Sequence, residues 1–223
     1  VVLGEVTTGK DELTQNAYLH MGLAYLQLAD KNKARMAFEQ AAASNANQKI
    51  KEQASYNYAL CIHETSYSAF GESVTVFENF LNEFPNSAYA NKVSNYLVEV
   101  YMNTRSYDAA LKSIERIAHP SRAILEAKQK ILFHLGTQYF ANTQFERAIL
   151  YFNHSIALGQ YTLQTRANAL YWRGESYYRL NRMQEAARNF NDYLSLTTQK
   201  NTEMYALAYY NLAYITFHKK DYA

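Results

Sequence analysis

The chain of 223 residues is nearly neutral, with 22 Lys and Arg against 20 Asp and Glu and a formal net charge of +2 at pH 7. This balance argues against a general nucleic-acid-binding protein, whose affinity would come largely from neutralising phosphates. The single cysteine, Cys61, excludes an intramolecular disulfide and a cysteine-based zinc site, and its apolar surroundings predict a buried thiol. No apolar run reaches the roughly 18 residues of a membrane-spanning helix, so we expect no direct membrane insertion.

A four-position pattern recurs along the chain. It consists of a small residue, an aromatic or apolar residue at +3, a second small residue at +12 and a bulky apolar residue at +16. The first residues of successive copies are 37, 39, 38, 38 and 39 residues apart. In chain order the copies are Gly22, Tyr25, Ala34, Phe38; then Ala59, Ile62, Ser73, Phe77 with two extra residues; then Val98, Tyr101, Ala110, Ile114; then Gly136, Tyr139, Ala148, Phe152; then Gly174, Tyr177, Ala186, Phe190; and a truncated copy from Ala213.

Each copy predicts two helices joined by a turn. Apolar residues fall at helical spacing, as in Leu132, Leu135 and Tyr139, and polar residues such as Asn181 and Arg182 separate the two halves. The small residues let the two helices approach closely, and the aromatic rings fill the space on either side. Because such a hairpin cannot bury its apolar faces alone, the copies are expected to stack into a solenoid. We therefore predict a lead-in segment over residues 1–14 and an array over residues 15–223, with five repeats of about 38 residues and a truncated sixth.

The pattern Gly-x-x-Tyr followed by Ala-x-x-x-Phe resembles the tetratricopeptide repeat (TPR), a helix–turn–helix unit of about 34 residues. The resemblance implies an all-α, right-handed superhelical solenoid of TPR hairpins. Arg173 departs from the pattern, because the other copies carry Met, Tyr or Leu before the small residue. The stretch FPNSAYA, residues 84–90, resembles a link in bacterial cell-envelope TPR proteins and implies a periplasmic or cell-envelope location. In this link Pro85 is expected to stop one helix and Ser87 to cap the next.

In TPR proteins the first helices of the repeats line a concave groove, and ligands usually lie there. At the corresponding positions this chain is rich in aromatic residues, which dominate binding energy at protein interfaces. The rings would anchor apolar side chains of a partner, the asparagines would bond its backbone, and Lys130 and Arg179 would pair with an acidic group. The alternative is that the rings only pack within the array. The candidate partner-binding residues are Asn95, Tyr96, Lys130, Phe133, His134, Phe140, Asn168, Tyr171, Trp172, Tyr178, Arg179 and Asn211.

Other kinds of site are not predicted. Some TPR proteins hold a chain-terminal carboxylate with a clamp that includes a Lys and an Asn of the first repeat. This chain has Leu19 and Leu23 at those two positions, so we expect no such clamp. Glu99 and Glu175 lie two repeats apart, which stacked helices would place about 20 Å from each other. A glycosidase pair needs roughly 5–9.5 Å. We therefore expect no catalytic residues and no enzyme activity.

Metal, cofactor and nucleic-acid sites are not predicted either. No two of the six histidines lie three or four residues apart, and every glycine is isolated, so the sequence has no helical metal-binding pair and no phosphate-binding loop. Only Lys92, Lys130 and Arg179 are cations at groove positions, so no cation recurs at one position in every repeat, unlike a repeat array that reads RNA base by base.

The sequence predicts a non-enzymatic scaffold that binds a protein or peptide segment in an aromatic-lined groove. The alternative function is an architectural spacer or self-association segment of a larger bacterial envelope protein. Tyr209, Tyr210, Leu212, Tyr214 and Phe217 crowd the last predicted helix, so a homodimer through this end belongs to that alternative.

Overall fold

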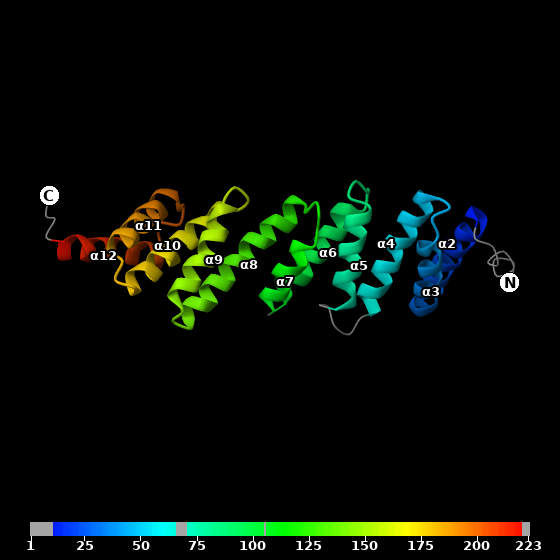
Figure 1. The fold of residues 1–223 in the computed structure, drawn as a ribbon, viewed down its shortest axis with the longest axis horizontal. Helices are drawn as coiled ribbons and strands as arrows, with labels where there is room; N and C mark the ends of the chain where they lie inside the picture. The colour runs from blue at the N-terminus through cyan, green and yellow to red at the C-terminus, as the bar shows by residue number, and fades with distance from the viewer. Residues whose placement is uncertain (1–10, 66–70, 105, 220–223) are drawn as a thin grey trace. The chain divides into compact units, whose positions relative to one another are not determined.

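The computed structural model describes residues 11–65, 71–104 and 106–219, and within them all regular structure is helical, which confirms the all-α class (Figure 1). The helices are α2 (Glu12–Gln27), α3 (Lys31–Ala43), α4 (Gln48–Thr65), α5 (Glu72–Glu83), α6 (Ala90–Asn103), α7 (Tyr107–Glu115), α8 (Arg122–Ala141), α9 (Phe145–Ala157), α10 (Leu163–Arg179), α11 (Met183–Leu196) and α12 (Glu203–Lys219).

The helices form two compact units. Unit 1 comprises residues 1–104 and 115–121, and unit 2 comprises residues 105–114 and 122–223. Within unit 1, α2 packs on α3, α3 on α4, α4 on α5 and α5 on α6; within unit 2, each helix from α8 to α12 packs on the next. The first helices α2 and α4 also contact each other, as do α8 and α10. Each unit is therefore a stack of helical hairpins, which confirms the predicted helical repeats.

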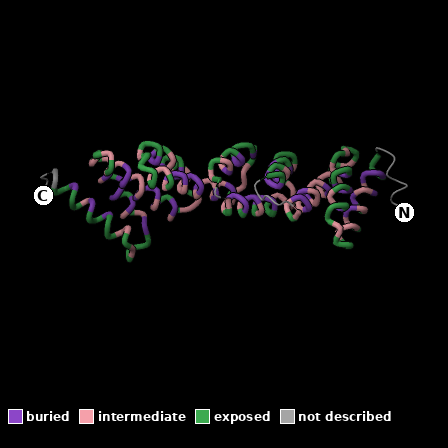
Figure 2. Tube along the Cα trace, turned by 90° about the horizontal axis from the view of Figure 1, so that it is seen from below, coloured by how far each residue is buried: buried purple, intermediate pink, exposed green. Residues whose placement is uncertain are grey.

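The recurring positions form the core of the hairpins. Figure 2 shows buried and exposed residues alternating along the helices, as expected for helices packed on one side. The residues that the pattern places at the second small and the last bulky position of each complete copy are all at most 2% exposed. They are Ala34, Ser73, Ala110, Ala148 and Ala186, followed by Phe38, Phe77, Ile114, Phe152 and Phe190.

The glycines make room for the phenylalanine of their own hairpin. A Cβ added at Gly136 would lie 2.5 Å from Cε1 of Phe152, and one added at Gly22 would lie equally close to Phe38. At Gly174 the nearest ring atom, on Phe190, would be 3.0 Å away. The predicted role of the small residue is thus confirmed, and the group that it admits is the ring sixteen residues later.

Three turns between paired helices share one backbone conformation. Their central residue has a φ of 58°, in the left-handed region that ends many helices. In one of them, the amides of Thr143 and Gln144 donate to the carbonyls of Phe140 and Tyr139 at 2.9 Å. These two bonds are those of a Schellman motif, which satisfies the last carbonyls of the helix. The three central residues are Ala29, Thr143 and Asn181.

Two roles were predicted in the link between the second and third repeats. Pro85 does follow the end of a helix, as predicted, whereas the prediction that Ser87 caps the next helix is wrong. Helix α5 ends at Glu83, just before Pro85, which cannot continue it. The N-cap of α6 is Tyr89, not Ser87. Ser87 instead starts a turn before the helix, where its Oγ accepts the amide of Tyr89 at 3.0 Å and its carbonyl accepts the amide of Ala90 at 3.0 Å.

Two buried glutamines connect a first helix to the loop that leads to the next hairpin. Nε2 of Gln15 donates to the carbonyl of Ser44 at 2.8 Å, and its Oε1 accepts the amide of Asn47 at 2.8 Å. Gln129 makes the same two kinds of bond to the carbonyl and amide of Thr162, each at 2.9 Å. These clamps fix where one hairpin starts relative to the previous one.

The free thiol of Cys61 is buried on α4, as predicted. Burial raises the pKa of this thiol to about 11, so it stays protonated at neutral pH and is a poor nucleophile.

Candidate functional site

Neighbouring first helices of unit 2 are joined by a row of aromatic side chains. The rings of Phe140 on α8 and Trp172 on α10 meet edge to face, with centroids 5.0 Å apart. Farther along α10, Tyr178 contacts Tyr214 of α12 with a centroid distance of 6.0 Å. Phe140, Trp172 and Tyr178 are neither fully buried nor fully exposed, so each ring is held on one side and meets solvent on the other.

Phe133 and His134 continue this row on α8. Phe133 packs against the buried Phe152, with a centroid distance of 6.1 Å. The ring of His134 stacks on Tyr107 at 5.3 Å with an interplanar angle of 12°. Burial lowers the pKa of His134, so the imidazole is neutral at pH 7.

The polar candidates of unit 2 differ in how they are engaged. The Lys130 ammonium pairs with Glu126 one turn earlier, at 2.9 Å. Asn168 accepts a hydrogen bond from Nε2 of Gln164, also at 2.9 Å. Arg179 is exposed at the end of α10.

Two further candidates lie beneath this surface, around Glu175, a carboxylate that the sequence analysis rejected as catalytic and gave no other role. Tyr171 is 4% and Asn211 8% exposed, and Nδ2 of Asn211 on α12 donates to Oε1 of Glu175 at 2.5 Å. Burial raises the pKa of Glu175, and it is also the main cause of a raised pKa at Tyr171. Hydrogen bonds from Tyr171 and Asn211 act in the opposite direction on Glu175, because they stabilise the carboxylate. These buried groups tie α12 to α10.

The remaining candidates, Asn95 and Tyr96, belong to unit 1. Asn95 is exposed on α6. Tyr96 stacks on the buried Phe77 with centroids 5.6 Å apart and also contacts His63 at 5.3 Å. Tyr96 thus has a packing role within unit 1.

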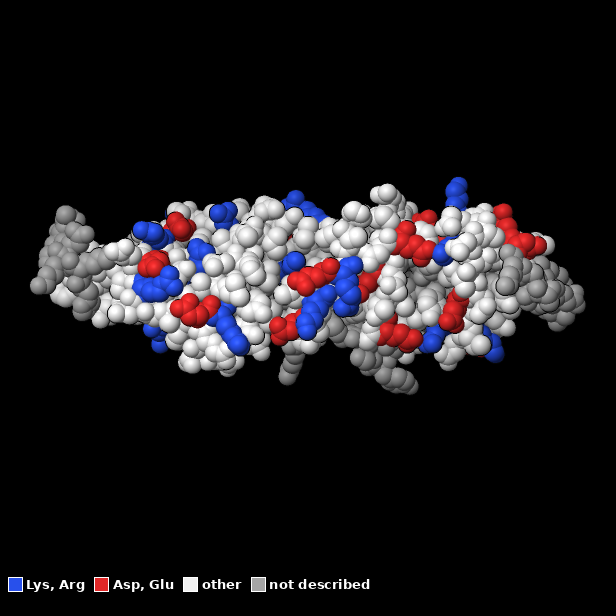
Figure 3. All heavy atoms as spheres, viewed as in Figure 1, with Lys and Arg blue, Asp and Glu red and all other residues white. Residues whose placement is uncertain are grey.

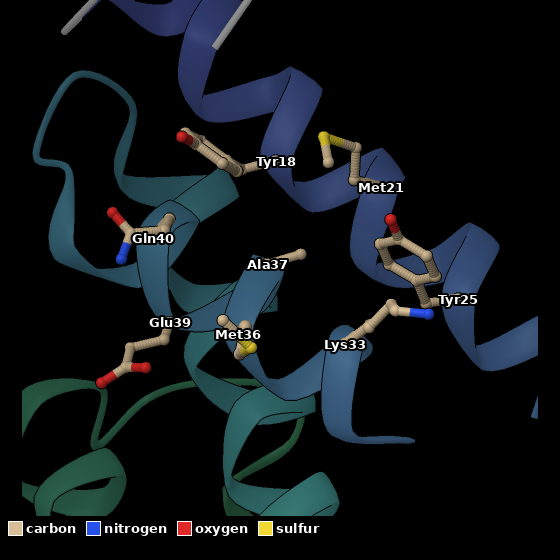
Figure 4. A pocket seen from close by; sticks show the side chains of 8 residues that line it. All are labelled: Tyr18, Met21, Tyr25, Lys33, Met36, Ala37, Glu39 and Gln40. Carbon is tan, nitrogen blue, oxygen red and sulfur yellow. The ribbon is translucent and has the colours of Figure 1, made fainter. Parts of the chain in front are cut away.

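The described part of the chain has cavities both within and between hairpins. One of about 490 Å³ opens between α2 and α3 (Figure 4), where Tyr18, Met21 and Tyr25 lie on one helix and Met36 and Gln40 on the other. Another of about 300 Å³ lies among α9, α10 and α11 and is lined in part by Arg173. Neither cavity carries a cluster of acid, base and nucleophile that would indicate catalysis.

The structure explains why an arginine, Arg173, stands before the small residue of its copy, where the other copies have Met, Tyr or Leu. Its Nε donates to Oδ1 of Asn189 on α11 at 2.7 Å, and its Nη1 donates to Oδ1 of Asn153 on α9 at 2.6 Å. The guanidinium thus bridges two hairpins at a position where other copies place an apolar side chain.

Within the described ranges, no three His, Cys, Asp or Glu side chains are grouped so as to hold a metal ion. The same part of the chain has no helix that is both long and apolar enough to span a membrane.

The sequence matches family models at both ends of the array. Residues 15–48 match one model of the tetratricopeptide repeat, and residues 133–201 match another. These two stretches are tetratricopeptide repeats. TPR arrays are generally modules for protein–protein interaction, which suggests a scaffold role for the repeats of this chain.

Among solved structures, the chain is similar to MamA from Desulfovibrio magneticus RS-1, with 18% identity and a TM-score of 0.35 over 84% of this chain and 97% of that one. It is also similar to MamA of strain AMB-1, with 19% identity and a TM-score of 0.39 over 88% and 98% of the two chains. The apo form of the quorum sensor NprR from B. thuringiensis gives 16% identity and a TM-score of 0.39 over 99% and 64%. No curated protein matches the sequence.

Eight of the twelve candidates therefore lie on the first TPR helices α8 and α10 with at least part of their surface in solvent. We call this set the aromatic face of unit 2. It consists of Lys130, Phe133, His134, Phe140, Asn168, Trp172, Tyr178 and Arg179.

Proposed function

We propose that the chain is a non-enzymatic TPR scaffold that binds a segment of a partner protein on the aromatic face of unit 2. The observation that carries this proposal is the contact between Phe140 and Trp172 across neighbouring first helices, with both rings half-buried. Such rings are pre-ordered by their neighbours, so little side-chain entropy is lost when a partner covers them. Partly solvated aromatic side chains beside an arginine are also the residue types of interface hot spots.

The buried candidates support this face from behind. Tyr171 meets Trp172 edge to face at 5.5 Å, and Asn211 anchors α12 through Glu175. In this proposal they position Trp172 and Tyr178 and do not themselves touch the partner.

The test compares the chain with a variant carrying Trp172→Ala and Tyr178→Ala in a pull-down from lysate and membrane extract of the source organism. A partner captured by the wild type is then purified and its affinity measured by calorimetry. Loss of one hot-spot ring costs about 2 kcal/mol, roughly 30-fold in affinity. The matched control is Leu150→Ala, which removes a 50% exposed side chain from the second helix α9. Equal affinity of the double variant and the control, with both folded by circular dichroism, would contradict the proposal.

A second candidate function, self-association, is favoured by α12. Leu207, Tyr210, Tyr214 and Phe217 follow a spacing of three and four residues along this helix and are 41%, 65%, 37% and 63% exposed. Much of α12 is coloured as exposed in Figure 2. Homodimers through α12 would appear as a mass that rises with concentration in analytical ultracentrifugation. Tyr210→Ser with Phe217→Ser should abolish that rise, and a constant monomer mass of the wild type would exclude this candidate.

A cell-envelope location stays a prediction from the residue 84–90 link. Fractionation of the source cells, with an antibody against this chain, tests it directly.

A further inference from the structure

The two units carry opposite net charge. Unit 1 has 8 Lys and Arg against 12 Asp and Glu, a formal charge of −4, whereas unit 2 has 14 against 8, a formal charge of +6. The small net charge of the whole chain hides this asymmetry. Figure 3 shows both signs interspersed on the face that it draws, so the difference is one of net field and not of a single-sign patch.

Ion pairs also differ between the units. In the described part of unit 1, five basic residues have an acidic partner within 4.0 Å: Lys31, Lys33, Arg35, Lys51 and Arg116. In the described part of unit 2, only Lys130 and Arg182 do. The exposed Arg166, Arg179 and Arg188 make no such pair with any described residue. These three arginines therefore carry positive charge of unit 2 that no ion pair with a described residue neutralises.

Among the eight residues of the aromatic face, the two charged side chains, Lys130 and Arg179, are both cations. Glu175, which lies beneath this face on α10, is 9% exposed and accepts a hydrogen bond from Asn211. His134 is neutral at pH 7 because burial lowers its pKa, and Lys130 is paired with Glu126. Arg179 is an exposed cation that makes no ion pair within 4.0 Å with a described residue, although its charge also lowers the pKa of Glu175.

We propose that the segment bound by the aromatic face of unit 2 is acidic, with an Asp or Glu side chain beside bulky apolar residues. This inference rests on the proposed function and adds the chemistry of the partner to it. The apolar residues would cover Phe140, Trp172 and Tyr178, while the carboxylate would accept two hydrogen bonds from the Arg179 guanidinium, a geometry that lysine cannot offer. The positive field of unit 2 would speed the encounter, and the negative field of unit 1 would keep the segment away from the equivalent face there.

The test is a selection of random peptides displayed on phage against the immobilised chain of residues 1–223, because it assumes no partner sequence. We expect the enriched peptides to combine Asp or Glu with Trp, Phe, Leu or Tyr. Their affinity should fall about tenfold between roughly 0.05 M and 0.5 M salt, since salt screens exposed charges. The enriched peptides could instead be apolar and neutral or basic and still bind through Trp172 and Tyr178. That result would overturn the inference that the bound segment is acidic and would leave the proposed function intact. Absence of any enriched peptide that depends on these two residues would contradict the proposed function itself.

Two charge-reversing substitutions distinguish direct recognition of the peptide by Arg179 from a general effect of the net charge of unit 2 on its affinity. Arg179→Glu should weaken an enriched peptide by about tenfold or more, because two charged hydrogen bonds become a repulsion. Arg188→Glu changes the charge of unit 2 equally, but lies on the second helix α11, and should weaken the peptide less than about threefold. Equal losses for the two variants would overturn the role of Arg179. Displacement of the peptide by a single-stranded oligothymidylate at low micromolar concentration would also overturn the proposal, since it would make the site one for a general polyanion.

Discussion

Replacing Gly136 by alanine tests the packing rule of the hairpins. Alanine favours a helix interior over glycine by about 1 kcal/mol, and Gly136 has no positive φ that would require glycine. The new Cβ would nevertheless lie 2.5 Å from Cε1 and 2.6 Å from Cδ1 of Phe152, a ring that is fully buried and in contact with Phe133. Overpacking of this kind costs about 1–3 kcal/mol. We expect Gly136→Ala to lower the free energy of unfolding by about 1 kcal/mol after the gain in helix propensity is included.

Two comparisons make this expectation refutable. At Gly174 the nearest ring atom would be 3.0 Å away, so Gly174→Ala should be close to neutral. In a Phe152→Leu background the obstructing ring is absent, and Gly136→Ala should become stabilising by up to about 1 kcal/mol, as helix propensity predicts. Urea unfolding followed by the fluorescence of Trp172, the only tryptophan, reports on unit 2. Stabilisation by Gly136→Ala in the wild-type background, or equal effects in both backgrounds, would refute the reasoning.

Three further substitutions follow from the geometry. Thr143→Gly should stabilise the chain by about 1 kcal/mol in the same unfolding assay, because a β-branched residue is strained at a φ of 58°, and a loss of stability would contradict this. Gln129→Leu should destabilise it by about 2–4 kcal/mol, because the amide and carbonyl of Thr162 lose their partners, and retained hydrogen–deuterium protection at that amide would count against the clamp. Burial raises the pKa of Glu175 in the folded chain above its value in the unfolded chain. The stability that this group contributes is therefore fully present below the unfolded pKa, and it is lost as the pH rises through the folded pKa. Glu175→Gln should therefore flatten the fall in stability above about pH 4.3, and an unchanged pH profile would show that burial does not govern this carboxyl.

The repeats could be predicted because their period is visible in single residue types. A glycine or alanine on one helix and a phenylalanine sixteen residues later can satisfy each other only in a close hairpin, as Gly136 and Phe152 do. The glutamine clamps were missed, although Gln15 and Gln129 each lie seven residues before the glycine of their repeat. The signal that could have indicated these buried glutamines is a polar residue within the apolar stripe of a helix. Its backbone partners lie in the following loop and cannot be assigned from periodicity.

The candidate site was predictable as a set of helix positions but not as a surface. The pattern places Tyr171 and Trp172 on the same helix face, yet one is buried against Tyr193 and the other is half-exposed. That difference depends on a neighbouring helix and not on the residue's own repeat. The role of Glu175 was missed for the same reason, since its partner Asn211 comes from α12, 36 residues later.

The most direct test of partner binding on the aromatic face uses Trp172, which is the only tryptophan and contacts Phe140 of the same face. A chain labelled with fluorotryptophan gives a single resonance in fluorine NMR, and the purified partner or an enriched peptide is titrated against it. We expect a saturable shift whose dissociation constant equals the calorimetric one, and loss of that shift in the Tyr178→Ala variant. Binding in the calorimeter with an unmoved Trp172 resonance would place the partner elsewhere and contradict the account.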